Sequence, residues 1–350
     1  MPLVNQQWIL KKRPVGLLKP SDLECRTSDV PPLKDGECLV KVKYLAMDPA
    51  TRGWMGESGG YVDPLPLDGP VMGVTVGEVI ESRNPAIGKG MIVAGVGPWA
   101  KYIVVGPKGI SPLRSGDLGV LAPMDTSTGH DLPVYLHALG TSGGTAYYGL
   151  MTIAAMKPAD KVLVSAAGGS VGSLACQFAK LKGASKVVGI AGGAAKCRVV
   201  KELYGCDAVI DYKSAGSIAA KIKAEFPDGL DVYFDNVGGE TLEAALDNLA
   251  KNARIAICGM ISQYNAPDER GVRNLWNLLV REARIEGFLV SSWFGSPECE
   301  AAYREIDGWL KSGRLNATLD IRDMFGDIAN AYNLLFTGGN RGRLIVRAPD

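Results

Sequence analysis

The sequence holds little that could bind a metal ion or form disulfide bonds. Its 350 residues include only two histidines, His130 and His137, and its seven cysteines are dispersed without a Cys-x-x-Cys pair. A zinc site needs clustered Cys or His ligands, so we expect a protein that works without zinc. An odd number of scattered cysteines is typical of free thiols in a reducing compartment, which predicts a cytoplasmic protein.

The sequence also lacks an excess of charge of one sign and an uninterrupted apolar run. Lys+Arg number 38 and Asp+Glu 37, which leaves a net charge of +1. This balance supplies no field to hold nucleic acid or an anionic membrane, so we expect neither as a partner. The longest stretch without formal charge, 132–156, is interrupted by Pro133 and several glycines. A membrane span needs about 20 mainly apolar residues, so none is expected.

Glycine, in contrast, is abundant, with 44 residues. Up to about residue 120, short β-like runs alternate with proline and glycine. Runs of this kind, separated by turn residues, predict a compact antiparallel barrel with irregular loops. The runs are 38–44, 71–80, 91–96 and 102–105.

From about residue 125 the pattern changes to strands that alternate with helices. Six strand-like apolar runs are separated by helix-length segments, which predicts a doubly wound parallel sheet. The tail 344–347 is β-like again and could rejoin the first sheet. We therefore expect an α/β fold in which a nucleotide-binding domain is inserted into a barrel domain. The six expected strands are 161–166, 186–190, 208–211, 232–236, 254–258 and 284–290.

A glycine-rich turn joins the first of these strands to a helix. In SAAGGSVG, residues 165–172, Gly169 and Gly172 match the second and third glycines of the dinucleotide fingerprint, with Ala167 at the first position. Gly169 would let the backbone approach a pyrophosphate, and the helix N-terminus would supply N–H groups and a positive dipole end. In this strand–turn–helix context we predict a dinucleotide site. The alternative is a tight turn with a structural role only.

The next strand distinguishes the two nicotinamide cofactors. An NAD site usually has a carboxylate about 20 residues after the glycine turn, where it bonds the ribose hydroxyl. The corresponding segment here, 189–195, reads GIAGGAA and holds no carboxylate, and the first charges after it are Lys196 and Arg198. A bare glycine loop followed by cations suits the additional 2′-phosphate of NADP. The alternative for Lys196 is a solvated lysine on a helix surface.

A series of motifs runs along the chain beyond this turn. They are SAAGGSVGSLACQFAKLKG, VIDYK, YFDNVGG, ICGMISQYN, EGFLV and GGNRGRLIV, with AMDPATRGWM and SGGTAYYGL in the first half. In this order they resemble the zinc-independent branch of the medium-chain dehydrogenase/reductase superfamily. The group they resemble most holds the NADPH-dependent 2-alkenal (double-bond) reductases, the prostaglandin reductases and the curcumin reductases. The resemblance spans nearly the whole chain, and ICGMISQYN is its most specific element.

The resemblance implies a fold, a cofactor and an assembly. The fold would be a GroES-like barrel, residues 1–125 and 316–350, with a Rossmann domain, 126–315, between its two parts. The cofactor would be NADP(H), with Lys196 and Tyr212 on the 2′-phosphate. Because members of this group commonly act as homodimers, a homodimer is expected. The implied cofactor contacts are Gly169, Ser170, Val171, Gly172, Lys196, Tyr212, Asn236, Cys258, Gly259, Met260, Ile261, Ser262, Gln263, Tyr264, Phe288, Leu289, Val290 and Asn340.

A reductase of activated double bonds needs a group that stabilises negative charge on the substrate oxygen. NADPH would deliver hydride to the β-carbon of an α,β-unsaturated carbonyl, and a hydrogen-bond donor would hold the resulting enolate. Tyr264 is the first candidate, because it follows strand 254–258 at the carboxyl end of the sheet, where open α/β sheets bind ligands. Its match to the family's motif supports that role. The alternative is a tyrosine that only packs on the nicotinamide.

Tyr61, in GGYVDP, is the second candidate hydroxyl. It resembles a substrate-loop tyrosine of the plant reductases, and the alternative is an ordinary loop anchor. The expected function is reduction of the α,β double bond of enals and enones. An NADPH:quinone oxidoreductase of the same fold and a redox sensor that binds NADPH without turnover remain open alternatives. The scarcity of zinc ligands argues against a zinc-dependent alcohol dehydrogenase.

Overall fold

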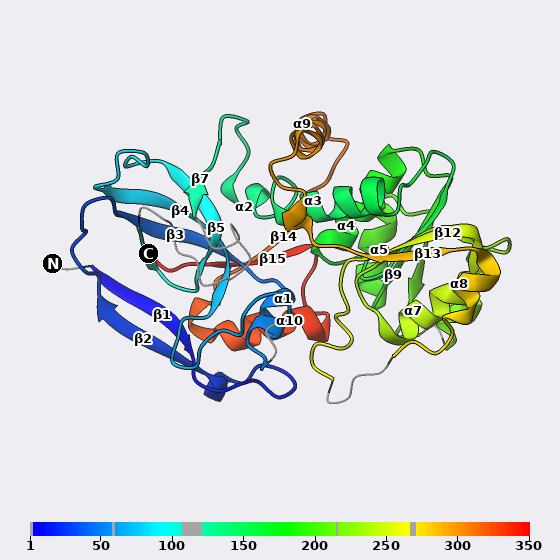
Figure 1. Ribbon diagram of the computed structural model, residues 1–350, viewed down its shortest axis with the longest axis horizontal. Coiled ribbons are helices and arrows are strands. Elements are labelled where there is room, and N and C mark those ends of the chain that lie inside the picture. The colour runs from blue at the N-terminus through cyan, green and yellow to red at the C-terminus, as the bar shows by residue number, and fades with distance from the viewer. Residues whose placement is uncertain (1–2, 58–59, 107–120, 215, 267–270) are drawn as a thin grey trace. The chain divides into compact units, whose positions relative to one another are not determined.

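The computed structural model describes residues 3–57, 60–106, 121–214, 216–266 and 271–350. In it the chain forms two units. The first combines residues 1–136 with 319–350, and the second is 137–318. In Figure 1 the first unit runs from blue to turquoise and ends in the red C-terminal segment, while the second is green to orange.

The first unit contains the antiparallel sheet that the sequence predicts. Its strand order is β14 (Leu319–Arg322), β15 (Arg343–Arg347), β3 (Cys38–Ala46), β4 (Met72–Ser82), β5 (Ile92–Pro98) and β7 (Ala122–Pro123), and β6 (Tyr102–Val105) also pairs with β3. Among the described strands of this sheet, only β14 and β15 pair in parallel. The red strand β15 lies beside the blue strand β3, with Ile345 opposite Ala46. The tail thus rejoins the first sheet, as expected, and the second unit is an insertion.

A separate two-stranded sheet in this unit was not predicted from the sequence. β1 (Val4–Leu10) pairs antiparallel with β2 (Leu23–Asp29). The sequence pattern misses β2 because it reads LECRTSD and is exposed over most of its length, so it shows no apolar alternation. The helices of the unit are α1 (Ala50–Trp54), α2 (Leu132–Tyr135) and α10 (Ile328–Thr337).

The two chain segments of the first unit are joined through its core. The fully buried Trp99 packs against Tyr332, with ring centroids 5.6 Å apart. The Tyr332 hydroxyl donates a hydrogen bond to the Asp48 carbonyl at 3.0 Å. Arg343, 1% exposed, pairs with the Asp48 carboxylate through its second guanidinium nitrogen at 3.0 Å. A buried charge is tolerated when it is paired in this way, so the C-terminal segment is integral to the fold.

The second unit contains the six-stranded parallel sheet that was predicted. Its strand order is β10 (Ala208–Asp211), β9 (Lys186–Ala191), β8 (Lys161–Val164), β11 (Leu230–Asp235), β12 (Leu249–Ile257) and β13 (Arg284–Gly287). Every neighbouring pair is parallel. The central strands are buried almost throughout, as in KVLV and VYF, because helices cover parallel sheets on both faces.

Helices alternate with these strands. Two begin at a serine whose side chain caps the helix: Ser217 accepts from the Ala220 N–H at 3.2 Å, and Ser296 accepts from the Cys299 N–H at 3.1 Å. The helices are α3 (Thr141–Tyr148), α4 (Ser170–Leu181), α5 (Ala194–Glu202), α6 (Ile218–Glu225), α7 (Gly239–Leu246), α8 (Trp276–Arg281) and α9 (Pro297–Lys311).

Two strand boundaries differ from the expected ones. β12 begins at Leu249 rather than at residue 254, and its pairing with β11 contains an irregularity near Leu230. β13 ends at Gly287 rather than at residue 290, and a 3-10 turn follows at Val290–Ser292. Phe288 leaves the strand because its ring packs beside Phe234, with ring centroids 6.3 Å apart.

The boundary between the units lies at 136/137, later than the expected 125/126. Leu136, which follows α2, packs in a buried cluster with Ala46, Val76 and Ile345 of the first sheet. The segment before residue 137 therefore belongs to the first unit by its packing. The change in sequence periodicity near residue 125 precedes this change in packing. At the other end, the second unit extends to 318 rather than 315.

Candidate cofactor and active site

Most of the predicted site residues lie at one edge of the parallel sheet. The segments that carry them follow β8, β9, β10, β11, β12 and β13, and all six strands run in the same direction. Their carboxyl ends therefore meet at the same edge, the usual ligand-binding position of open α/β sheets. We call this set the strand-end group; it comprises Gly169, Ser170, Val171, Gly172, Lys196, Tyr212, Asn236, residues 258–264 and residues 288–290.

The glycine turn is tight and leads directly into helix α4. Ala166 has φ 47°, in the left-handed region, and its carbonyl accepts from the Gly169 N–H at 2.9 Å. A Cβ on Gly172 would lie 2.3 Å from that carbonyl oxygen, so glycine is needed for this close packing. Gly169 precedes the first residue of α4 and has no side chain to cap it. The N-terminal N–H groups of α4 are therefore suited to an anion.

The hydroxyl of Ser170 points to two residues of its own unit. It lies 3.1 Å from His137 Nδ1 and donates to Ser142 Oγ at 2.8 Å. His137 is fully buried, so its contact with Ser170 fixes the first turn of α4 to the interior of the unit. Ser170 would then meet a cofactor through its backbone N–H, and Val171, the next helical residue, is partly buried. The sequence did not show this contact, because 33 positions separate His137 from Ser170.

Lys196 and Tyr212 each lie against a glycine of a neighbouring segment. A Cβ on Gly168 would come within 2.4 Å of Lys196 Cγ, and a Cβ on Gly192 would lie 2.6 Å from the Tyr212 ring. The missing side chains thus make room for these two residues. Tyr212 remains 49% exposed, so its face is accessible to a ligand. The two candidate 2′-phosphate ligands lie on segments after the adjacent strands β9 and β10.

One carboxylate near this position was missed from the sequence. Asp211, the last residue of β10, accepts from the Gly193 N–H at 2.8 Å and from the Lys213 N–H at 3.0 Å. The hydrogen bond from Gly193 is the main reason that the pKa of Asp211 lies below its ordinary value. Asp211 therefore holds the glycine loop after β9 through the backbone.

The segment after β12 folds onto the turn after β11. The Ile261 N–H donates to the Asn236 carbonyl at 3.2 Å, and Ser262 Oγ donates to the Val237 carbonyl at 2.6 Å. Asn236 in turn donates from Nδ2 to the Ser165 carbonyl at 2.8 Å, next to the glycine turn. The backbone between Met260 and Gln263 closes a tight turn, with N–H to O at 2.8 Å. Three separate parts of the sequence thus form one hydrogen-bonded surface.

Tyr264 lies across its own segment. Its hydroxyl oxygen accepts from the Met260 N–H at 3.2 Å, and a Cβ on Gly259 would lie 3.1 Å from that oxygen. With the oxygen engaged as an acceptor, the hydroxyl proton can be donated to another oxygen. Burial raises the pKa of Tyr264 above its ordinary value, so the hydroxyl keeps its proton at neutral pH.

Burial raises the pKa of two further acidic groups near this surface. Burial raises the pKa of the Cys258 thiol to about 12, with a smaller contribution from the charge of Asp235. Asp235 itself is fully buried, and burial raises its pKa while hydrogen bonds from Tyr233 and the backbone oppose that shift. Sequence reasoning did not single out Asp235, although it stands directly before Asn236.

The residues after β13 divide between core and surface. The Phe288 ring packs edge-on against Tyr148, with centroids 5.6 Å apart, and a Cβ on Gly149 would lie 2.6 Å from it. Leu289 is 46% exposed and Val290 is partly buried. Leu289 and Val290 are therefore better placed than Phe288 to meet a ligand with their side chains.

Two predicted residues belong to the other unit and are not part of the strand-end group. Tyr61 is 45% exposed, and its ring stands edge-on to Trp54, with centroids 6.3 Å apart. Asn340 is 5% exposed and donates from Nδ2 to the Gly342 carbonyl at 3.2 Å. Their roles stay predictions.

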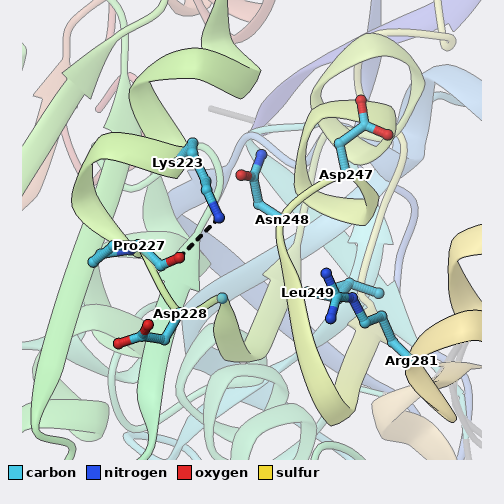
Figure 2. A pocket seen from close by; sticks show the side chains of 8 residues that line it. Lys223, Pro227, Asp228, Asp247, Asn248, Leu249 and Arg281 are labelled. Atoms are coloured by element: carbon cyan, nitrogen blue, oxygen red, sulfur yellow. Dashed lines mark hydrogen bonds between the residues drawn. The ribbon is translucent and has the colours of Figure 1, made fainter.

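A small cavity lies at the opposite, amino-terminal edge of the parallel sheet. It measures about 160 Å³ and is lined by Lys223, Pro227, Asp228, Gly229, Asp247, Asn248, Leu249 and Arg281. Figure 2 shows the Lys223 ammonium donating to the Pro227 carbonyl, at 2.8 Å. Helices α6, α7 and α8 all end beside this cavity, so its cations complement their negative dipole ends. No predicted site residue lines it.

Two searches of the described residues bear on other kinds of site. Within them, no group of three or more His, Cys, Asp or Glu side chains is arranged to hold a metal ion. No helix in the described part of the chain combines the length and apolar character needed to cross a membrane.

Comparison with known proteins identifies the family of this chain. Residues 6–113 match a family model described as the N-terminal domain of oxidoreductase, and residues 170–308 match one described as zinc-binding dehydrogenase. The 2-alkenal reductase (NADP(+)-dependent) of Nicotiana tabacum is 36% identical over 98% of this chain and 97% of its own. The NADPH-dependent curcumin reductase of Escherichia coli (strain K12) is 32% identical over 98% and 96%.

A solved structure agrees with the family models and with the two relatives. CurA from Vibrio vulnificus in complex with NADPH superposes with a TM-score of 0.87 at 31% identity, over 99% of each chain. Identity above 30% therefore extends over nearly the full length of the chain. This chain therefore belongs to the zinc-independent branch of the medium-chain dehydrogenase/reductase superfamily, in the group of 2-alkenal, prostaglandin and curcumin reductases.

Proposed function

We propose that this protein is an NADPH-dependent reductase of the α,β carbon–carbon double bond of enals and enones. The observation that carries the proposal is the strand-end group, in which a glycine turn, a carboxylate-free glycine loop and the pair Lys196 and Tyr212 share one edge. The relatives named above are NADP-dependent reductases of alkenals and of curcumin, which supports the same chemistry here.

The residues present suit NADP(H). Gly168 and Gly192 leave room for Lys196 and Tyr212, and Gly172 allows the close packing of the glycine turn, which supports a dinucleotide site here. The N–H groups of Gly169–Gly172 would hold the pyrophosphate, and Lys196 and Tyr212 the 2′-phosphate. Asn236, the segment 258–264 and residues 288–290 would line the remainder. When bound, NADPH supplies the hydride for the β-carbon of the substrate.

Tyr264 would stabilise the enolate that forms on the substrate. Its proton is retained because burial raises its pKa, and its oxygen is already held by the Met260 N–H. A positioned donor that meets charge as it develops is the usual way to lower such a barrier. Tyr61 is the second candidate for contact with substrate. The α-carbon would then receive a proton from solvent or a neighbouring hydroxyl, which completes the reduction.

We also propose that the protein is a homodimer that associates through α8 and β13. Trp276 and Leu279 of α8 are 69% and 66% exposed, and all four residues of β13 at the sheet edge are exposed. An exposed apolar patch beside an open strand edge is typical of an interface. A second copy is the simplest occupant, because β13 can pair antiparallel with its own equivalent about a two-fold axis.

All seven cysteines are free thiols, which supports a cytoplasmic location.

The experiment that tests the proposed function is NADPH oxidation by the purified protein across a panel of enals, enones and quinones. Products should be identified by mass spectrometry, and we expect saturated aldehydes or ketones. Turnover confined to quinones would support the quinone oxidoreductase instead. Retention of NADPH without oxidation by any member of the panel would support a redox sensor.

A further inference from the structure

A fully buried carboxylate lies beneath the segments proposed to line the cofactor. Asp235, the last residue of β11, is 0% exposed. It accepts from Tyr233 Oη at 2.7 Å, from Ser165 Oγ at 2.9 Å and from the Val237 N–H at 2.9 Å, and the Gly238 N–H adds a contact at 3.1 Å. Among the described residues, no ion pair joins Asp235 to a lysine or arginine.

The hydrogen-bond pattern favours the charged form of this group. The N–H groups of Val237 and Gly238 can only donate, and together with the hydroxyls of Tyr233 and Ser165 they meet the same carboxyl oxygen, Oδ1. Hydrogen bonds donated to a carboxyl oxygen stabilise its negative charge. The arrangement is therefore complementary to a carboxylate, held by neutral dipoles rather than by a counter-ion. Because water is excluded, the field of such a charge is screened weakly and extends into the neighbouring site.

Asp235 also connects the three backbone segments of that site. Its carbonyl accepts from the Cys258 N–H at 2.8 Å and from the Gly259 N–H at 3.1 Å. Ser165, which bonds its carboxylate, precedes the glycine turn and also accepts from the Asn236 N–H at 2.8 Å. The residues that follow β8, β11 and β12 are thus tied to one side chain and its peptide group.

We propose that Asp235 is a positioning residue whose buried negative charge makes the site favour the oxidised, cationic nicotinamide over the reduced, neutral one. This inference rests on the proposed NADP(H) site. Preference for the cationic ring would lower the cost of giving up hydride. Asp235 would act on the cofactor through the segments it holds and through its field, without itself touching the reacting atoms.

The test is the ratio of the dissociation constants of NADP⁺ and NADPH, measured by calorimetry or tryptophan fluorescence without any substrate. In Asp235→Asn, which keeps the shape and removes the charge, NADP⁺ should lose at least about fivefold in affinity relative to NADPH. Tyr233→Phe is the matched control, because it removes one neutral donor and keeps the charge. It should weaken both forms alike and leave the ratio within about twofold of wild type.

A purely structural role would change both affinities of Asp235→Asn equally, and that result overturns the inference. If circular dichroism shows that Asp235→Asn does not fold, Asn236→Asp places a second anion at the same strand end. In Asn236→Asp, the affinity for NADP⁺ should rise relative to the affinity for NADPH. An unchanged ratio of the two dissociation constants, or a shift in favour of NADPH, overturns the inference. A wild-type protein that binds neither form overturns the proposed function, and the inference with it.

Discussion

We expect the preference for NADPH to depend on Lys196, at the start of α5. Lys196 lies against Gly168, at the start of the glycine turn, whereas Arg198 is exposed two positions later on the same helix. Lys196 and Arg198 are the first two charged residues after the carboxylate-free segment 189–195. Lys196 lies against the glycine turn, whereas Arg198 is exposed to solvent. The structure therefore separates two cations that the sequence presents as a pair.

Lys196→Ala should weaken NADPH binding by about ten- to a hundredfold and leave NADH nearly unchanged. The reason is the loss of a charge-assisted contact with the 2′-phosphate, worth on the order of 1.5–3 kcal/mol. Fluorescence titration of both cofactors gives the two dissociation constants. Arg198→Ala is the control and should bind NADPH like wild type. Equal losses for NADPH and NADH in Lys196→Ala would remove the proposed phosphate role.

Tyr264→Phe should lower turnover at least about tenfold, because a donor to the enolate is lost while the ring remains. The affinity for NADPH should change little. Burial raises the pKa of Tyr264, so its hydroxyl stays protonated through neutral pH. Titration of Tyr264 should therefore cause no fall in wild-type turnover between about pH 7 and 9. Single-turnover rates, with Tyr61→Phe measured alongside, show which hydroxyl is needed. Wild-type rates in Tyr264→Phe would assign that residue to packing.

Cys258 should resist alkylation although it lies in the segment proposed to contact the cofactor. With its pKa raised to about 12, the reactive thiolate is a fraction of about one in ten thousand at pH 8. This protection suits a site that handles electrophilic enals. Iodoacetamide labelling at pH 8, followed by peptide mass spectrometry, should modify the exposed Cys25 well before Cys258. Faster modification of Cys258 would show that its thiol is not shielded.

At the scale of elements, close approach of strand and helix decides which glycines are needed. Gly189 is buried in β9, where a Cβ would lie 2.7 Å from Val200 Cγ1 and 2.8 Å from the Ala167 Cβ. Gly308 is exposed in α9, and no heavy atom lies within 4 Å of its Cβ position. The two glycines look alike in the sequence, yet they differ in what surrounds them.

Gly189→Ala should lower the free energy of unfolding by about 1–3 kcal/mol, because the added methyl group overpacks the contact of β9 with α5 and the glycine turn. Gly308→Ala should raise it by up to about 1 kcal/mol, because alanine favours the helix and restricts the unfolded chain. Urea unfolding followed by circular dichroism measures both. A Gly189→Ala variant as stable as wild type would mean that this packing adjusts freely.

At the scale of the whole molecule, the exposed face of α8 and β13 predicts the state of assembly. Trp276→Glu places a charge in the proposed interface, where burial without a partner is costly. The wild-type protein should have the mass of two chains by light scattering, and the variant should shift toward one. Val15→Glu changes an apolar residue that is 80% exposed in the other unit and should leave the mass unchanged. A monomeric wild-type protein would contradict the proposed dimer.

Much of the fold follows from local patterns in the chain. Strands such as β8 and β11 are short apolar runs, and the glycine turn lies between a strand and a helix, so both can be identified from neighbouring residues. β2 was missed because its exposed residues carry no apolar alternation, and the end of β13 was misplaced because the packing of Phe288 on Phe234 ends it. Element boundaries set by such distant contacts have no local signal.

The sequence by itself determined the parallel sheet, the inserted arrangement, the glycine turn and the absence of a carboxylate in 189–195. These features depend on residue type and spacing along the chain. Only the tertiary structure placed His137 behind Ser170, set Lys196 against Gly168 and enclosed Asp235 among four donors. The reason is that burial and hydrogen bonding arise between segments far apart in sequence, where no periodicity records which groups meet.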